Sequence, residues 1–341
     1  MILRDGPKRP RYPLALIHPL GPLFRYLPPE LRRHLLYLRT CGRWGNFTHP
    51  KLWSEKMAWR ALDDDRTILK MGADKLASKE YMRRVIAAQG TEGTCSIPET
   101  YWVGRSVREL REHEHQLPAR WVLKPNHSSG RVVLVDTARE PVDWERLERV
   151  ASRWLAPDEE VTVMAHQAYG GARPLLFAEQ RIGSLQTSPH DVRVVGFTPR
   201  TGVATIWEIQ ESTGSHTPAI MNYRFTGTFT RKERYHSRDG APNDATLIES
   251  SSEQARRALL DIGRSAAAPF DHVRVDFYIE AGSLWFGELT VYPGAGLRTF
   301  NIGVDRERGA LWELPDLSAP DPREAEWRAL LAETPRGTLQ A

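Results

Sequence analysis

The chain has 341 residues, of which 40% are hydrophobic and 26% charged, and it carries a net charge of +4. These values are typical of an ordinary globular protein with room for two or three lobes. The modest positive charge favours an anionic substrate or cofactor and leaves nucleic acid only a remote partner. Two cysteines, Cys41 and Cys95, are too few for a disulfide framework and lack metal-ligand spacing.

The N-terminal stretch from Pro13 to Phe24 is apolar but is interrupted by prolines and a glycine. No run approaches the roughly 18 apolar residues of a spanning helix, and no signal-peptide cleavage pattern is present. Together with the unpaired cysteines, these patterns lead us to expect a cytoplasmic protein without a transmembrane segment.

An extended arm is predicted for residues 1–27, followed by a helix that begins at Pro28. Leucines give this helix an apolar stripe and basic residues give it a second face. The leucines are Leu31, Leu35, Leu36 and Leu38, and the basic residues are Arg32, Arg33, His34 and Arg39. Two interpretations stay open: a peripheral dock for an anionic membrane surface or polymer, and a basic face turned to solvent.

Local patterns then predict alternating helices and strands. A short helix begins near Ser54, and Asp74 can cap a longer one from Lys75 to about Ala88. Strands are predicted at 98–103, 121–125, 131–135, 175–182, 191–197 and 204–209, and helices at 108–115, 144–154 and 251–267. The segment after Trp312 is expected to be a surface tail with one helix. Because strands and helices mix without strict alternation, the fold class is α+β.

The most informative stretch is a pair of strands, Val273 to Tyr278 and Trp285 to Thr290, closed by Tyr292-Pro293-Gly294-Ala295-Gly296. Each strand carries one acidic residue, Asp276 or Glu288, where an inward-facing residue is expected. Two carboxylates on one face suit Mg²⁺, which takes oxygen ligands and is often shared with substrate phosphates. The pair therefore predicts phosphate chemistry.

Lys124 ends an apolar strand directly before the small-residue loop Ser128-Ser129-Gly130. A lysine in such surroundings is rare unless it is paired, and the loop could cradle a phosphate. An exposed lysine at the end of an ordinary hairpin is the alternative. The chain has no Walker A motif and no complete Gly-x-Gly-x-x-Gly after a strand.

Taken in order, these pieces resemble the ATP-grasp superfamily, and most closely its TupA-like branch. The resemblance covers roughly residues 44–312 and is carried by residues 52–59, 73–81, 117–130 and 273–296. It implies two α+β lobes with the nucleotide between them and a helical N-terminal extension. The implied bounds are 1–72 for the arm and helical cap, 73–178 for the small lid lobe, 179–312 for the large lobe, and 313–341 for the surface tail.

The resemblance also assigns the ATP-binding residues. Lys75 and Lys124 would grip the α and β phosphates, and the loop over the β and γ phosphates would consist of Ser128, Ser129 and Gly130. A hinge at Glu179, followed by Gln180, Arg181 and Ile182, would bind the adenine edge largely through backbone groups. Asp191 would contact the ribose hydroxyls.

By the same resemblance, Asp276 and Glu288 would hold two Mg²⁺ ions, with Thr290 in the place where many relatives have Asn. Arg274 would point at the γ-phosphate or the intermediate, and Arg298 would clamp a substrate carboxylate. From the residues alone, Arg274 and Asp276 could equally form a plain ion pair on one strand face.

The implied activity is that of a carboxylate-amine ligase, which forms an amide or peptide bond through an acyl phosphate. The substrates would be a carboxylate and an amine on a peptide-like metabolite or a cell-surface polymer precursor. Two alternatives stay open: a kinase-type phosphotransferase, and a nucleotide-binding accessory protein of polysaccharide assembly. His127 and His272 are expected to be structural or solvent-facing rather than catalytic bases, and no oligomeric state follows from the sequence.

Overall fold

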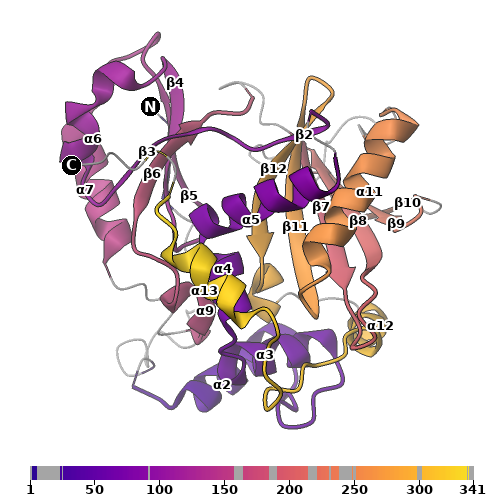
Figure 1. Ribbon diagram of the computed structural model, residues 1–341. Helices are drawn as coiled ribbons and strands as arrows, with labels where there is room; N and C mark the ends of the chain where they lie inside the picture. Colours follow the sequence, from indigo (N-terminus) through magenta and orange to yellow (C-terminus); the bar gives the residue numbers. More distant parts are fainter. Residues whose placement is uncertain are drawn as a thin grey trace.

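The computed structural model describes residues 2–5, 24, 26–90, 93–156, 164–183, 190–213, 221–229, 232–237, 248, 251–297, 302–335 and 337. Two β-sheets lie side by side, the smaller on the left of Figure 1 and the larger on the right. Within the described ranges, no helix has the length and apolar character needed to cross a membrane.

The two sheets are almost entirely antiparallel. The small sheet has the order β1-β5-β4-β6-β3 and the large sheet the order β10-β9-β8-β7-β11-β12-β2, with only the β12–β2 pair parallel. The strands are β1 (Ile2–Asp5), β2 (Cys95–Ser96), β3 (Thr100–Gly104), β4 (Arg120–Pro125), β5 (Arg131–Asp136), β6 (Leu176–Gln180), β7 (His190–Phe197), β8 (Thr205–Thr213), β9 (Met221–Thr226), β10 (Lys232–Ser237), β11 (His272–Glu280) and β12 (Ser283–Thr290). Such sheets combined with helices confirm the α+β class.

Helices cover both sheets and extend below them in Figure 1. They are α2 (Pro29–Cys41), α3 (Trp53–Asp63), α4 (Thr67–Ala73), α5 (Lys75–Ala88), α6 (Val107–Glu112), α7 (Trp144–Leu155), α9 (Gln167–Gly170), α11 (Glu253–Ala267), α12 (Ile302–Leu311) and α13 (Glu324–Ala332), with 3₁₀ turns η3 (Glu114–Gln116) and η4 (Pro293–Gly296). The predicted cap of α5 is confirmed, because the Asp74 carboxylate accepts a hydrogen bond of 2.8 Å from Ala77 N. The N-cap of α3 is Leu52, a neighbour of Ser54.

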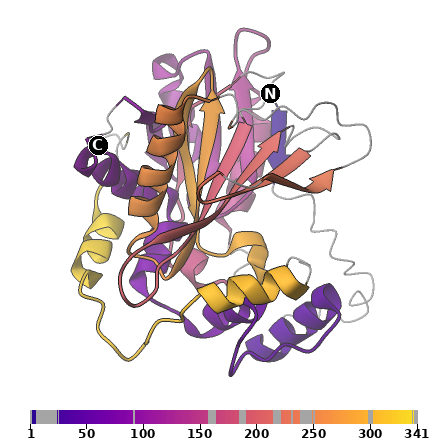
Figure 2. The ribbon, with the colours of Figure 1, turned by 90° about the vertical axis from the view of Figure 1, so that its right-hand side faces the viewer.

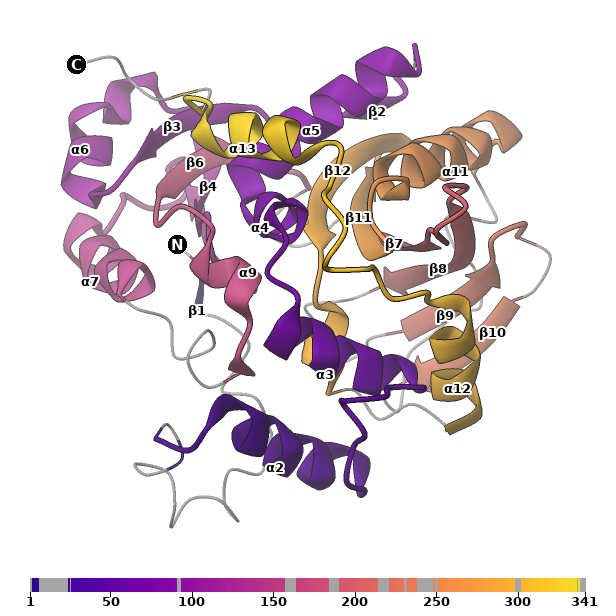
Figure 3. The ribbon, with the colours of Figure 1, turned by 60° about the horizontal axis from the view of Figure 1, so that its bottom comes forward.

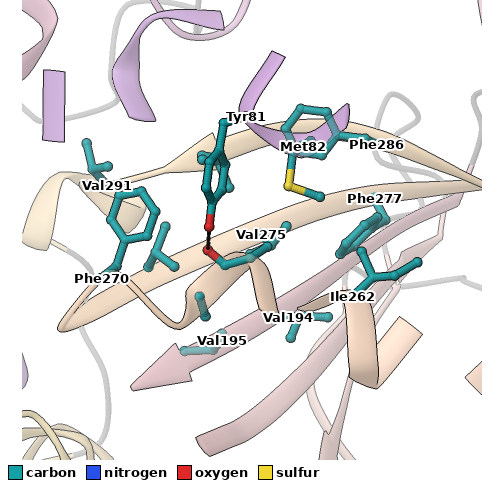
Figure 4. Packing of buried hydrophobic residues seen from close by; sticks show 14 of the residues in the cluster. Tyr81, Met82, Val194, Val195, Ile262, Phe270, Val275, Phe277, Phe286 and Val291 are labelled. Atoms are coloured by element: carbon teal, nitrogen blue, oxygen red, sulfur yellow. Dashed lines mark hydrogen bonds between the residues drawn. The ribbon is translucent and has the colours of Figure 1, made fainter. Parts of the chain in front are cut away.

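One face of the large sheet packs against α11 and α5 and forms the main hydrophobic core (Figures 2 and 4). Val275 and Phe277 on β11 point into this core, and the Tyr81 hydroxyl on α5 donates to Ala266 O at 3.0 Å. Because successive strand residues alternate between faces, Arg274 and Asp276 lie on the opposite face. That opposite face is polar and carries the candidate site.

The small sheet has its own core, formed with α6 and α7 on its outer side in Figure 1. The predicted hairpin is confirmed: β4 and β5 pair antiparallel across the loop at 126–130. Helix α5 and strand β2 fall inside the predicted small lobe, residues 73–178, but pack with the large sheet. Residues 73–178 therefore do not pack only with the small sheet.

The sequence predicted a surface tail after Trp312, and this prediction is wrong. Its one predicted helix exists as α13, but Trp327 is fully buried in the main core and Leu330 is 1% exposed. Beyond α13, Gly337 O accepts a hydrogen bond of 3.1 Å from Val103 N on the edge strand β3. The prolines and charges that suggested a tail occupy its turns, while one apolar side of the helix docks on α4 and α5.

We expect Trp327→Ala to lower the free energy of unfolding by about 3–5 kcal/mol, because it removes a large side chain from a packed core. Urea denaturation measures this loss. Trp44→Ala is the matched control, since Trp44 is 55% exposed. A loss no larger for Trp327→Ala than for this control would contradict the packing of α13.

The basic face predicted for α2 is also wrong at two positions. Arg32 and Arg33 are 7% and 1% exposed, whereas Leu31 and Leu38 are 38% and 41% exposed. Figure 3 shows α2 beside α3 at the bottom of the molecule. Because Arg33 reaches inward to backbone carbonyls, neither a membrane dock nor a solvated basic face describes these two arginines.

Candidate active site

A bulge in the β11–β12 pair brings the two predicted carboxylates together. Asp276 lies opposite Glu288, but Phe277 lies opposite Phe286, so Gly287 is an extra residue on β12. In a regular strand, Phe286 and Glu288 would share a face, because they are two residues apart. The bulge breaks this alternation, so that Phe286 enters the core and Glu288 joins Asp276 on the polar face. A Cβ at position 287 would lie 3.0 Å from Asp276 O, which explains the glycine.

The polar row continues across the sheet to the predicted Asp191 and to Arg193 and Gln210, which the sequence analysis did not single out. Asp276 lies opposite Arg193 on β7, and Arg193 lies opposite Gln210 on β8. Arg193 also donates to Asp191 at 3.2 Å, and Asp191 lies opposite Tyr278. These residues follow the same alternation as Asp276, which is the signal that could have found them.

Arg274 forms a bidentate ion pair with Asp276, with Nε and Nη2 each 2.6 Å from a carboxylate oxygen. Nη2 also donates to Thr290 Oγ1 at 3.1 Å, and Thr290 Oγ1 lies 3.4 Å from Asp276. The same-face ion pair, one of the two interpretations of Arg274, is thus present. In the described part of the chain, nothing accepts a hydrogen bond from Arg274 Nη1.

The charges on this face shift one another's pKa values. Burial raises the pKa of Asp276 although Arg274 opposes it. Burial acts in the same direction on Glu288, but Lys75 and Arg274 outweigh it and lower the pKa of that carboxyl. Lys75 Nζ lies 3.2 Å from Glu288 Oε2. Glu288 is therefore an anion held beside a lysine of α5.

The donor set fits a hard divalent cation. Two carboxylates and the Thr290 hydroxyl meet on one face and offer only oxygen, which Mg²⁺ prefers. Among the described residues, no group of three or more His, Cys, Asp or Glu side chains could hold a metal by itself. A cation here would need oxygens from another source, as expected for an ion shared with phosphates.

The small sheet contributes a second charged cluster around Glu179. Lys124 Nζ and Lys79 Nζ lie 2.5 and 2.7 Å from its two carboxylate oxygens. Burial alone would raise the pKa of Glu179, but the two lysines lower it to about 2. Burial lowers the pKa of Lys79, whereas the carboxylates of Glu179 and Glu288 raise that of Lys124 against burial.

Lys124 therefore lies within electrostatic reach of Glu288 on the large sheet. It is a paired, partly buried lysine and not an exposed strand-end one. Lys79 was missed by the sequence analysis, although it lies four residues after Lys75 and so on the same side of α5.

A buried network fixes Lys75 at the start of α5. Arg173 donates to both carboxylate oxygens of Asp74 at 2.8 Å, and Asn126 Nδ2 donates to Asp74 at 2.7 Å. Asn126 Oδ1 accepts from Leu76 N at 2.9 Å. These hydrogen bonds connect the loop after β4 to the N-terminus of α5. Lys75 therefore lies next to β4, the strand that carries Lys124. Sequence reasoning found neither Asn126 nor Arg173.

The predicted phosphate loop lies directly after this network. Ser128 is 3% exposed, and its hydroxyl finds no hydrogen-bond partner among the described residues. Ser129 is half-buried and Gly130 is exposed, with a φ of 72° that favours glycine. An orphaned buried hydroxyl and a left-handed glycine fit a loop that closes around a ligand oxygen.

The predicted hinge lies at the end of β6. Gln180 is engaged there, because its N donates to Glu99 O at 2.8 Å and its side-chain oxygen accepts from Glu99 N at 3.2 Å. Arg181 and Ile182 follow the strand and are half-buried. Arg298 lies outside the described residues.

Both predicted structural histidines are structural. His272 is fully buried, accepts from Trp53 Nε1 at 2.9 Å and lies 2.9 Å from Gly196 O. His127 is 6% exposed and lies 3.0 Å from Trp154 O. A third histidine, His166, is 4% exposed and stacks on Tyr292 with ring centroids 4.6 Å apart.

We expect stability to fall as the pH drops from about 6.5 towards 5. Burial lowers the pKa of His166 and of His272 to about 3. Above pH 6.5 both histidines are neutral in the folded and in the unfolded protein. Below this pH only the unfolded chain binds the protons, which lowers the free energy of unfolding by about 2 kcal/mol per histidine at pH 5. Unfolding curves at several pH values for wild type and His166→Phe test this, and an equally steep pH dependence in both would contradict it.

A small cavity of about 20 Å³, partly open to solvent, lies beside Arg274, the partner of Asp276. Its lining comes from six elements, α3, β7, β8, β11, η4 and α12, and consists of Trp53, Val195, Gln210, His272, Arg274, Pro293, Gly294 and Arg308. Arg308 is held by Glu208, 3.0 Å away, and lies over the Trp207 ring. The cavity thus offers a cationic wall beside Arg274 and an indole wall at Trp53.

Known structures resemble this chain only distantly. Biotin carboxylase from Campylobacter jejuni aligns at 13% identity with a TM-score of 0.41, over 73% of this chain and 48% of that one. D-alanine–D-alanine ligase from Bacillus anthracis aligns at 12% identity with a TM-score of 0.33, over 74% of this chain and 65% of that one. The chain spans about half the length of several solved structures that it matches, between 46% and 52% of three of them.

Nothing among the curated proteins matches the chain. A family model does: the TupA-like ATP-grasp model matches residues 55–312, well over half of the chain. That range contains Lys75, Lys124, Glu179, Asp276 and Glu288. The chain therefore belongs to the TupA-like ATP-grasp family.

Proposed function

We propose that the protein is an ATP-dependent carboxylate-amine ligase that forms an amide or peptide bond through an acyl phosphate. The observation that carries this proposal is the convergence of two charged clusters. Lys75 pairs with Glu288 at 3.2 Å, and Lys124 lies within electrostatic reach of the same carboxylate, which lies opposite Asp276 on the neighbouring strand. An arrangement of this kind can hold a polyphosphate between lysines and carboxylate-bound cations.

Lys75, Lys124 and Lys79 would supply positive charge to the nucleotide phosphates, and the loop Ser128, Ser129 and Gly130 would close over them. Glu179 would keep Lys124 and Lys79 in place rather than bind the base itself, since its carboxylate is paired with both lysines. The hinge residues Gln180, Arg181 and Ile182 would bind adenine, and Asp191 the ribose.

In the reaction, an oxygen of the substrate carboxylate attacks the γ-phosphorus of ATP, and the bond to the β,γ-bridging oxygen breaks to release ADP. An amine then attacks the carbonyl carbon of the acyl phosphate, loses a proton, and expels inorganic phosphate to leave the amide. Most of the work is positioning and charge neutralisation. Arg274, with Nη1 directed away from Asp276, would stabilise negative charge on the transferring group.

Mg²⁺ at Asp276, Glu288 and Thr290 would neutralise phosphate charge when bound. In the structure, Arg274 pairs with Asp276 and Lys75 pairs with Glu288. The acid would bind beside Arg274, and Arg298 would clamp a substrate carboxylate. A cytoplasmic location and the lobe bounds given above belong to the same proposal.

Hydroxylamine trapping tests the proposal against its nearest alternative. The protein is incubated with ATP, Mg²⁺ and a panel of amino acids, short peptides and sugar acids, and the products are read by mass spectrometry. A hydroxamate formed from one acid without an amine supports the ligase. A stable phosphorylated product that hydroxylamine leaves unchanged would instead establish a kinase-type phosphotransferase.

A further inference from the structure

The turn η4 has an unusual backbone. Gly294, Ala295 and Gly296 all have left-handed φ values, of 58°, 58° and 64°. Glycine adopts this conformation freely, but for alanine it is disfavoured because the Cβ crowds the backbone. Ala295 therefore stays left-handed only because its surroundings hold it there.

This turn forms one wall of the cavity beside Arg274. It begins three residues after Thr290, and its Pro293 and Gly294 line the cavity together with Arg274. A shift of the turn would change the shape of the space next to the Arg274 guanidinium. The position of the turn is thus coupled to any molecule bound beside Arg274.

Arg33 of α2 holds the turn from behind. Its side chain is 1% exposed, and Nη2 donates to Ala295 O at 2.6 Å while Nη1 donates to Met164 O at 3.4 Å. A Cβ at Gly296 would lie 2.8 Å from Arg33 Nη2 and 2.5 Å from Met57 Cγ. The turn is therefore seated directly on this guanidinium.

Helix α2 also packs against the residue that follows the turn. Leu297 is 2% exposed and forms a separate small core with Leu36 and Tyr37 of α2 and with Phe47 and Ala58. The helix thus contacts the turn through one charged and several apolar groups. Yet α2 ends at Cys41, before residue 55, where the family model begins to match.

We propose that Arg33 is a positioning residue, through which the N-terminal helix α2 shapes the acid-binding side of the active site. The donation to Ala295 O holds the left-handed turn, and the turn in turn bounds the cavity beside Arg274. This inference rests on the proposed function for the identity of the bound molecule. The contact by which Arg33 holds the turn does not depend on the proposed function.

The test compares Arg33→Met, Arg33→Lys, Ala295→Gly and the double variant Arg33→Met with Ala295→Gly in the full chain. Leu38→Ala, on the exposed side of α2, is the control. Three quantities are measured: hydrogen exchange of peptides covering residues 291–297 without ligands, ATP affinity by calorimetry, and KM for the acid found by hydroxylamine trapping.

For Arg33→Met we expect faster exchange confined to residues 291–297 and a KM for the acid raised about tenfold or more, with ATP affinity within about twofold. Glycine at 295 adopts the left-handed conformation unaided, so the double variant should recover part of both losses. Arg33→Lys should lie between wild type and Arg33→Met.

Unchanged exchange at 291–297 in Arg33→Met, or an ATP affinity that falls as much as that of the acid, would overturn the proposal. So would a double variant no better than Arg33→Met. If no acid gives a hydroxamate, the ligase assignment fails, but local exchange and its recovery by Ala295→Gly still decide whether Arg33 holds the turn.

Discussion

Replacing Lys124 by alanine will abolish ATP-dependent ADP formation, with a loss of at least about 10³-fold in turnover. Lys124 links the two charged clusters, because it pairs with Glu179 at 2.5 Å and lies within electrostatic reach of Glu288. Its removal takes away a cation from the place where phosphate charge would collect. ADP release measured by a coupled assay gives the rate.

The fold should survive this substitution, because Glu179 keeps its second partner, Lys79, at 2.7 Å. Circular dichroism and a thermal unfolding curve check that point. Lys51→Ala is the matched control, since Lys51 is exposed and takes part in none of the ion pairs of the two clusters. Near-normal ADP formation by a folded Lys124→Ala protein would show that the phosphates bind elsewhere.

The second large effect is expected for Glu288→Gln, which keeps the shape of the side chain but removes its charge. We expect ADP formation to fall by roughly 10²- to 10³-fold, because the amide is a poorer cation ligand and no longer pairs with Lys75. The rate is measured over a range of Mg²⁺ concentrations. Glu253→Gln, on the exposed start of α11, is the control.

Asp276→Asn should reduce turnover to a similar extent but should also lower stability. Arg274 is bound to Asp276 through two hydrogen bonds of 2.6 Å and would be left with a buried, unbalanced charge. Glu288→Gln leaves behind only Lys75, whose side chain is 15% exposed. Activity in Glu288→Gln that rises back to the wild-type level at ordinary Mg²⁺ concentrations would argue against a cation at this carboxylate.

Much of the site was predictable because the patterns that place it are local. The cap at Asp74 and the hairpin that ends at Lys124 depend on neighbouring residues, and both are confirmed. The strand pair that carries Asp276 and Glu288 is also where it was predicted, at β11 and β12.

What could not be predicted depends on contacts between distant residues. Arg33 finds its acceptor on Ala295, 262 positions away, and nothing in the pattern of α2 points to it. Trp327 enters the core only because α13 returns to α4 and α5. The bulge at Gly287 could be predicted only in part. A lone glycine within a strand indicates a bulge, but only the pairing register shows that the bulge brings Glu288 to the same face as Asp276.

The most direct test of the ligase mechanism follows single oxygen atoms. The acid identified by hydroxylamine trapping is labelled with oxygen-18 in its carboxylate and converted with ATP and an amine, and the released phosphate is analysed by mass spectrometry. If an acyl phosphate forms, each phosphate carries one oxygen-18 from the acid. Phosphate without the label, released together with the amide, would contradict carboxylate attack on the γ-phosphorus.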